Sequence, residues 1–159
     1  MVKNIHKSQL KGTYHAQPSK SLAHRYLMCA GLAKGTSVID NIVLSKDIKA
    51  TINGMKEWAD VTLSPSIRFN NRTKVTIKGM TKTKSIKHIQ CFESGTTLRF
   101  YSLICAAMGG KTRFSGMGRL PERPMEPIFS IYEQDHIAYQ KEKDRVLPLL
   151  IEGKLKGGS

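Results

Sequence analysis

The sequence is poor in cysteine, and the few cysteines it has are not arranged for a metal or a disulfide framework. Its three cysteines, Cys29, Cys91 and Cys105, are an odd number without CxxC spacing or a paired histidine motif. Two of them fall in predicted helices, and we expect plain buried thiols. The five histidines are scattered singly and are interpreted as structural or surface residues. The sequence therefore predicts no metal site.

Long apolar runs are also missing. No stretch approaches the roughly 18 apolar residues of a membrane-spanning helix. The N-terminal MVKNIHKSQLKG has charges but no apolar segment behind them, unlike a secretory signal. With 40% apolar residues and only 6 prolines, the 159-residue chain is long enough to bury a real core. We expect one soluble, cytoplasmic globular domain.

No pattern of catalytic side chains stands out. The chain shows no Ser-His-Asp or Cys-His order and no close acidic pair suited to acid-base work. The glycine-rich segments GGKT (109–112) and GMGRLP (116–121) lack the spacing of nucleotide-binding fingerprints, so no cofactor is expected. Four acidic residues are interpreted as caps and surface charges: Asp47, Asp60, Glu93 and Glu122.

Acidic residues are few, which leaves a large positive charge. The chain has 26 Lys and Arg against 12 Asp and Glu, a net charge of +14. Such a field attracts polyanions, and nucleic acid, a phosphorylated metabolite and an anionic membrane surface all qualify. A basic nucleic-acid-binding module is therefore one hypothesis. Against it, the basic residues are spread along the chain and no aromatic-rich stacking motif is visible.

The spacing of apolar residues predicts an α/β chain. Helices are expected from residue 19 or 21 to residue 35, and over 47–59, 94–108 and 124–131. Strands are expected over 2–5, 10–14, 38–42, 61–63, 67–69, 74–78, 85–90, 111–114, 137–141 and 146–151.

The second half of the chain repeats the order of the first. A shift of 75 positions superposes five pairs at equivalent structural places: Ser19 and Ser94, Ser21 and Thr96, Tyr26 and Tyr101, Gly35 and Gly110, Ile39 and Phe114. We interpret these as two strand-helix-strand-helix-strand-strand units, over about 15–84 and 85–159, that stack on each other. Chance similarity between two α/β stretches is the alternative.

Each unit begins its first helix with small hydroxyl residues and an arginine. The first helix has Lys20, Ser21 and Arg25, and the second has Ser94, Gly95, Thr96, Thr97 and Arg99. A helix N-terminus carries unpaired N–H groups and about half a positive charge, so it suits anions. At Gly95 the lack of a side chain leaves the backbone N–H groups accessible. The alternative is ordinary capping with two solvated arginines.

A third basic cluster lies in the segment GRLPERPMEP, which holds Arg119 and Arg123 between a predicted strand and helix. A guanidinium pairs bidentately with a carboxylate or phosphate, and two of the prolines stiffen this segment. The alternative is a turn with exposed charge.

These residues lie in motifs that resemble one enzyme family. PSKSLAHRYLMCAGLAKGTSVIDNIVLSKDI resembles the opening of 5-enolpyruvylshikimate-3-phosphate synthases, with its P-x-K-S-x-x-x-R start. ESGTTLRF and LPERPMEPI are similar to that family's glycine-threonine-arginine segment and arginine-proline motif, in the same order and spacing. The closing LPLLIEGKLKGG resembles the family's next landmark. The resemblance covers essentially the whole chain.

The resemblance implies a fold and a division of the chain. Family members have two domains, each an inside-out α/β barrel of three strand-helix units, with the active site in the cleft between them. By this resemblance, residues 15–159 form two of the three units of the N-terminal-half domain. Residues 1–14 would form strands that pair with the second domain. We therefore expect a truncated chain that lacks the C-terminal half.

The resemblance also implies an activity. The family moves the enolpyruvyl group of phosphoenolpyruvate to the 5-hydroxyl of shikimate 3-phosphate and releases phosphate, a step of aromatic amino acid biosynthesis. By matching position, Lys20 contacts both substrates, Ser21 and Arg25 bind shikimate 3-phosphate, and Gly95 and Arg123 bind phosphoenolpyruvate. Thr96 and Arg99 are supporting candidates. The family's proton-transfer residues lie in the later half, so we expect anion binding without turnover by this chain alone.

Two points qualify the resemblance. In the family, glyphosate competes at the phosphoenolpyruvate site, beside Gly95, and Phe100 stands where many members have proline. The sister family of UDP-N-acetylglucosamine enolpyruvyl transferases shares the fold and the chemistry. It has Lys-Asn in place of Lys20-Ser21 and normally uses a cysteine nucleophile, so the sequence favours the shikimate family and keeps the sister as an alternative.

Overall fold

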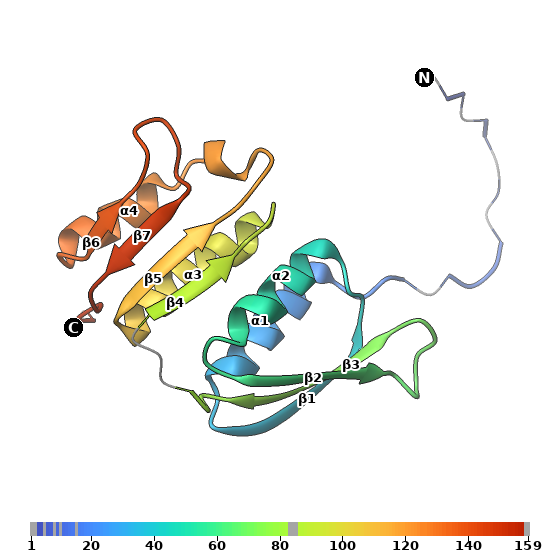
Figure 1. Ribbon diagram of the computed structural model, residues 1–159. Helices are drawn as coiled ribbons and strands as arrows, with labels where there is room; N and C mark the ends of the chain where they lie inside the picture. Colours follow the sequence, from blue (N-terminus) through green and yellow to red (C-terminus); the bar gives the residue numbers. More distant parts are fainter. Residues whose placement is uncertain are drawn as a thin grey trace.

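The computed structural model describes residues 3–4, 6–7, 9, 11–14, 16–82 and 86–157, which form a mixed α/β structure (Figure 1). The helices are α1 (Lys20–Leu32), α2 (Lys46–Met55), α3 (Gly95–Met108) and α4 (Glu126–Gln134), with a short 3-10 helix η1 (Leu120–Glu122). The strands are β1 (Gly35–Ile42), β2 (Asp60–Pro65), β3 (Thr73–Gly79), β4 (Ile86–Gln90), β5 (Lys111–Ser115), β6 (Ala138–Gln140) and β7 (Leu149–Glu152).

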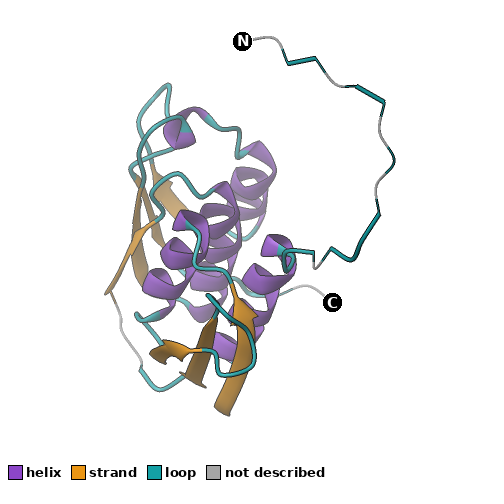
Figure 2. Ribbon diagram, turned by 90° about the vertical axis from the view of Figure 1, so that its right-hand side faces the viewer, coloured by secondary structure: helices purple, strands orange, loops and turns teal. Residues whose placement is uncertain are grey.

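The strands form two sheets of related topology. The first sheet has the order β1-β3-β2 with antiparallel pairs, and the second has the order β4-β5-β7-β6. In the second sheet β4 and β5 are parallel, and the other pairs are antiparallel. Strands β1, β3 and β2 correspond to β5, β7 and β6, because the two sets have the same order in their sheets and all their neighbouring strands are antiparallel. The helices lie between the two sheets (Figure 2).

Among the described residues, strand β4 has no counterpart in the first sheet. Shifting it back by 75 positions gives residues 11–15, but the described residues 11–14 belong to neither sheet. The strand expected over 10–14 is therefore wrong for those residues, and the one expected over 2–5 rests on Val2 and Ile5, outside the described residues. Within the described chain, the edge of β1 away from β3 has no partner strand.

Other boundaries differ because local hydrogen bonds interrupt the apolar pattern. The strand expected over 67–69 is a turn between β2 and β3, in which the Ser66 hydroxyl accepts from the Phe69 N–H (3.1 Å). Asn71, with a φ of 54°, completes the reversal. β7 begins only at Leu149, three residues later than expected, directly after Pro148, which has no N–H to donate.

The two halves of the chain are joined where α2 packs on α3. The Tyr101 hydroxyl donates to the Thr51 carbonyl at 2.6 Å, and its ring packs edge-on against Trp58 with centroids 4.9 Å apart. The ring also fills the space beside Gly54, where an added Cβ would lie 2.7 Å from a ring carbon. Tyr101, Trp58 and Gly54 are all buried, so one hydrophobic core runs through both halves of the chain.

Gly54→Ala should destabilise the chain. The new methyl collides with the Tyr101 ring, and overpacking of this kind costs about 1–3 kcal/mol. Urea unfolding followed by the fluorescence of Trp58, the single tryptophan, measures the loss. The matched control is Asn53→Ala, on the exposed side of the same helix. Equal unfolding midpoints for the two variants would contradict this account of the interface.

The cysteines divide into two kinds. Cys91 and Cys105 are buried, and burial raises the pKa of each thiol to about 12. Cys29 is exposed on α1, so the expectation that it is buried is wrong. It is exposed because the face of α1 that also carries Tyr26 is not covered by other described residues.

A thiol reagent such as 5,5′-dithiobis(2-nitrobenzoate) should therefore modify one thiol of the native chain quickly at pH 8. The two buried thiols should react only after unfolding, because their thiolate fraction and their access are both low. Cys29→Ser should abolish the fast phase, whereas Cys91→Ser should leave it intact. Two fast thiols in the native protein would rule out this packing.

Candidate anion site at two helix N-termini

The start of α1 presents the first predicted cluster to solvent. Ser19 is the N-cap, and its hydroxyl accepts from the Leu22 N–H at 3.3 Å. Lys20, Ser21 and Arg25 are all exposed in the first turns of the helix. Arg25 folds back along the helix, and its Nη1 donates to the Ser21 carbonyl at 3.3 Å. The structure thus brings these three residues together at the positive end of the helix dipole.

Lys20 already has an anionic partner. Its Nζ lies 2.7 Å from the Asp47 carboxylate, and both groups are partly solvent-exposed. Asp47 stands in the first turn of α2, whose N-cap is Ser45. A hollow of about 230 Å³ lies beside the pair, between the start of α1 and the start of α2. From the sequence, Asp47 was interpreted as a cap or surface charge. The ion pair was not predicted, because Lys20 and Asp47 are 27 residues apart.

The start of α3 forms a second cluster around Gly95. Ser94 is the N-cap, and its hydroxyl accepts from the Thr97 N–H at 3.2 Å. A Cβ added at the buried Gly95 would lie 2.8 Å from Arg123 Nη1 and 3.1 Å from Arg99 Nη1. The ends of two guanidinium groups thus lie close over Gly95, and a larger side chain at this position would have to displace them. The half-buried Thr96 follows it in the helix.

The arginine-proline segment is folded over this helix start. Arg99 Nη2 donates to the Pro124 carbonyl at 3.1 Å, which ties α3 to the segment. Arg119 and Arg123 flank η1 and line a hollow of about 320 Å³ together with Glu122 and Pro124. The predicted third basic cluster therefore joins the second one, with Arg123 close to Gly95.

The α1 and α3 clusters lie at the N-terminal ends of helices from the two halves of the chain (Figure 1). No hydrogen bond or ion pair among the described residues joins the two clusters directly. A buried chain of side chains does connect their helices: His24 of α1, Thr51 of α2, and Thr97 and Ser94 of α3. The sequence gives no signal for this connection, since His24 falls at an unspecified position of the P-x-K-S-x-x-x-R pattern and Thr51 lies in no motif.

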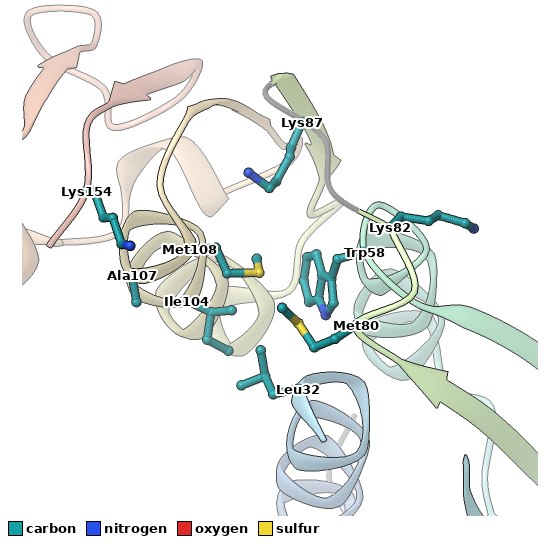
Figure 3. Close-up of a pocket in the computed structure, with 9 residues that line it drawn as sticks. All are labelled: Leu32, Trp58, Met80, Lys82, Lys87, Ile104, Ala107, Met108 and Lys154. Carbon is teal, nitrogen blue, oxygen red and sulfur yellow. The ribbon is translucent and has the colours of Figure 1, made fainter. Parts of the chain in front are cut away.

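A separate hollow of about 380 Å³ lies near the opposite ends of these helices, between Leu32 of α1 and Met108 of α3 (Figure 3). Three lysines line it, but Lys82 is paired with Asp60 at 2.8 Å and Lys87 donates to the Gly109 carbonyl at 2.8 Å. The C-terminal end of a helix carries a partial negative charge, which disfavours anions. The helix starts are therefore the better anion site.

The described part of the chain contains no group of three or more His, Cys, Asp or Glu residues placed to hold a metal ion. None of its helices is long and apolar enough to cross a membrane.

Residues 5–159 match the family model described as EPSP synthase (3-phosphoshikimate 1-carboxyvinyltransferase). The chain belongs to the EPSP synthase family. A 3-phosphoshikimate 1-carboxyvinyltransferase of Clostridium perfringens is 43% identical over 153 residues, and one of Clostridium acetobutylicum is 38% identical over 149 residues. These alignments cover 95% and 94% of this chain.

Solved structures agree with this assignment. An EPSP synthase from Acinetobacter baumannii superposes with a TM-score of 0.75 at 25% identity, over 92% of this chain and 33% of that structure. The chain spans about a third of the curated relatives that it matches, 34% of each Clostridium protein above. The resemblance stated from the sequence is thus confirmed at the level of the EPSP synthase family.

Asp47→Asn should strengthen anion binding at the start of α1. The substitution removes the carboxylate that pairs with Lys20, so a sulfate ion that binds the Lys20 amine no longer has to displace this carboxylate. Partly exposed pairs of this type are weak, so the affinity for sulfate should rise by about twofold to fivefold. Titration followed by the amide NMR signal of Ser21 measures it. Asp144→Asn, in an exposed loop, changes the net charge equally, and an equal gain there would show a general charge effect.

Proposed function

We propose that this chain contributes the N-terminal-half substrate walls of an enolpyruvyl transferase. The start of α1 would bind shikimate 3-phosphate through Lys20, Ser21 and Arg25. The start of α3 would bind phosphoenolpyruvate through Gly95 and Arg123, with Thr96 and Arg99 in support and Lys20 contacting both. The observation that carries the proposal is the convergence of Arg99 and Arg123 on Gly95 in a chain of this family.

The proposed reaction suits such a site. The enolpyruvyl group of phosphoenolpyruvate passes to the 5-hydroxyl of shikimate 3-phosphate by addition and elimination, and phosphate leaves. Both substrates are multiply charged anions that repel each other, so fixed cations must hold them side by side. In the proposed arrangement Arg25 faces one anion and Arg123 faces the other, and each guanidinium can pair with a planar anionic group through two hydrogen bonds.

We infer that other parts of a longer protein complete this half-site. The α1 and α3 surfaces expose large apolar side chains: Leu22 (45%), Tyr26 (54%) and Phe100 (40%). Together with the unpartnered edge of β1, they support our proposal that a third strand-helix unit completes the domain. Residues 1–14 would pair with the second domain. The proton-transfer groups would come from that domain, so this chain alone should bind substrates without turning them over.

Calorimetry with shikimate 3-phosphate tests the assignment. Lys20→Ala and Arg25→Ala should each weaken binding by about tenfold to a hundredfold, because a hydrogen bond to a charged group contributes about 1.5–3 kcal/mol. Arg123→Ala should leave shikimate 3-phosphate binding unchanged and weaken phosphoenolpyruvate binding instead. The control is Arg145→Ala, an exposed arginine in the loop after β6. Measurable binding that survives Lys20→Ala together with Arg25→Ala would refute the site.

The nucleic-acid alternative rests on the net charge of +14 alone. It predicts retention of duplex DNA in a gel shift at low salt, with affinity that falls steeply as salt rises, since each neutralised phosphate releases counterions. Weak retention that shikimate 3-phosphate does not compete away would show general electrostatic attraction and leave the proposed site untouched.

A further inference from the structure

A chain of three buried hydrogen bonds links α1 to the N-cap of α3. His24 Nδ1 lies 2.8 Å from Thr51 Oγ1, which lies 2.8 Å from Thr97 Oγ1. Thr97 Oγ1 in turn lies 2.8 Å from Ser94 Oγ. All four residues are at most 1% exposed, so water does not compete for these bonds. The chain ends one residue before Gly95, where the structure places Arg99 and Arg123.

Each hydroxyl has one proton, and the described residues offer the Thr51 and Thr97 hydroxyls no acceptor outside this chain, so both protons are used within it only when all three bonds point the same way. In the inward direction Ser94 donates to Thr97, Thr97 to Thr51, and Thr51 to His24 Nδ1. In the outward direction His24 Nδ1–H donates to Thr51, Thr51 to Thr97, and Thr97 to Ser94. In the outward direction the Ser94 hydroxyl proton takes no part in these three bonds, and it is available to donate at the positive end of α3.

The two directions of the hydrogen-bond chain differ in how many buried polar groups they leave without a hydrogen-bond partner. His24 Nε2 is buried and has no hydrogen-bond partner among the described residues. The inward direction leaves only that Nε2–H unpaired. The outward direction leaves the Nε2 lone pair unpaired and also the Ser94 proton, for which the described residues offer no acceptor. Each unpaired buried group costs free energy, so the inward direction is preferred.

We propose that His24 is a positioning residue for the anion bound at the start of α3. Acting through Thr51 and Thr97, it sets the direction of the Ser94 hydroxyl, and a bound anion reverses the chain so that Ser94 donates to it. The proposal rests on the proposed function, because it needs an anion beside Gly95. Ser94 thereby becomes a further binding residue, since a hydroxyl donor to an anion forms a strong, charge-assisted bond.

The reversed direction is also the one that a protonated His24 requires, because the imidazolium donates at both ring nitrogens. In the free chain, burial lowers the pKa of His24, Asp47 raises it, and Lys20 lowers it. Asp47 lies at the start of α2 and Lys20 on the helix of His24 itself. An anion that favours the outward direction favours the protonated ring. Anion binding therefore raises the pKa of His24, and affinity rises as the pH falls.

Sulfate tests this linkage, because its charge stays constant between pH 8 and pH 5.5. The Gly95 amide NMR signal reports binding, and the His24 ring signals report the pKa of His24. Saturating sulfate should raise that pKa by about 1, which corresponds to affinity about tenfold higher for the protonated ring. In His24→Asn, whose Oδ1 accepts from Thr51 without titrating, the affinity should lose most of this pH dependence.

Variants of Thr51 separate the hydrogen-bond chain from simple charge attraction. Thr51→Val keeps the shape and the distance between His24 and the anion but breaks the chain, so the rise in the His24 pKa should fall to about a third. Thr51→Ser should restore it. Thr112→Val, a buried threonine of β5 outside the chain, and His136→Asn, an exposed histidine with a φ of 57°, are the matched controls. An equal rise in Thr51→Val and in the wild-type chain would overturn the proposal.

A second measurement needs no anion. The inward direction predicts that the neutral His24 ring carries its proton on Nε2, which ¹⁵N spectra of the ring distinguish from Nδ1 protonation. Thr51→Val should mix the two tautomers. If Gly95 does not respond to sulfate, the proposed function fails for this chain, and the tautomer still decides the direction of the hydrogen-bond chain. A proton found on Nδ1 in the unliganded wild-type protein would overturn the inward direction and, with it, the reversal.

Discussion

The packing of α2 against α3 is the contact on which the remaining arrangement depends. At Gly54 the absence of a side chain admits the Tyr101 ring, which donates to the backbone of α2 and contacts Trp58 edge-on. The contact fixes how one half of the chain sits on the other. Because α1 packs on α2, it also fixes where the start of α1 lies relative to the start of α3. The positions of the basic residues are therefore a consequence of core packing.

The starts of α1 and α3 share a serine N-cap but differ in the partners of their basic side chains. Each has a serine N-cap whose hydroxyl accepts a backbone N–H, a common source of helix-end stability. At α1 the lysine is held by the carboxylate of Asp47, so its charge is partly offset. At α3 two guanidinium groups crowd Gly95, and no carboxylate contact offsets either of them in the described structure. The two helix starts thus differ in whether a carboxylate already pairs with their basic side chains.

The sequence predicted the helix starts well, because small hydroxyl residues at a helix start are local signals. The first helix was expected to begin at residue 19 or 21 and the third at residue 94, and Ser19 and Ser94 are the N-caps of α1 and α3. It failed where partners lie far apart: the ion pair of Lys20 spans 27 residues, and the bond between Thr51 and Thr97 spans 46. The strand expected over 67–69 failed for a different, local reason, since one serine hydroxyl in a turn outweighed an apolar pattern three residues long.

The unpartnered edge of β1 has a consequence for the chain in solution. Its eight residues leave N–H and C=O groups along one side without a partner strand in the described structure, and Val38 is 61% exposed. An edge of that kind is a template on which another strand can add, whether from the same protein or from a second copy. The charge of +14 works against the second outcome, because copies that approach each other repel. Colloidal behaviour of this chain is thus a balance between backbone pairing at one edge and long-range repulsion, and added salt shifts that balance toward association.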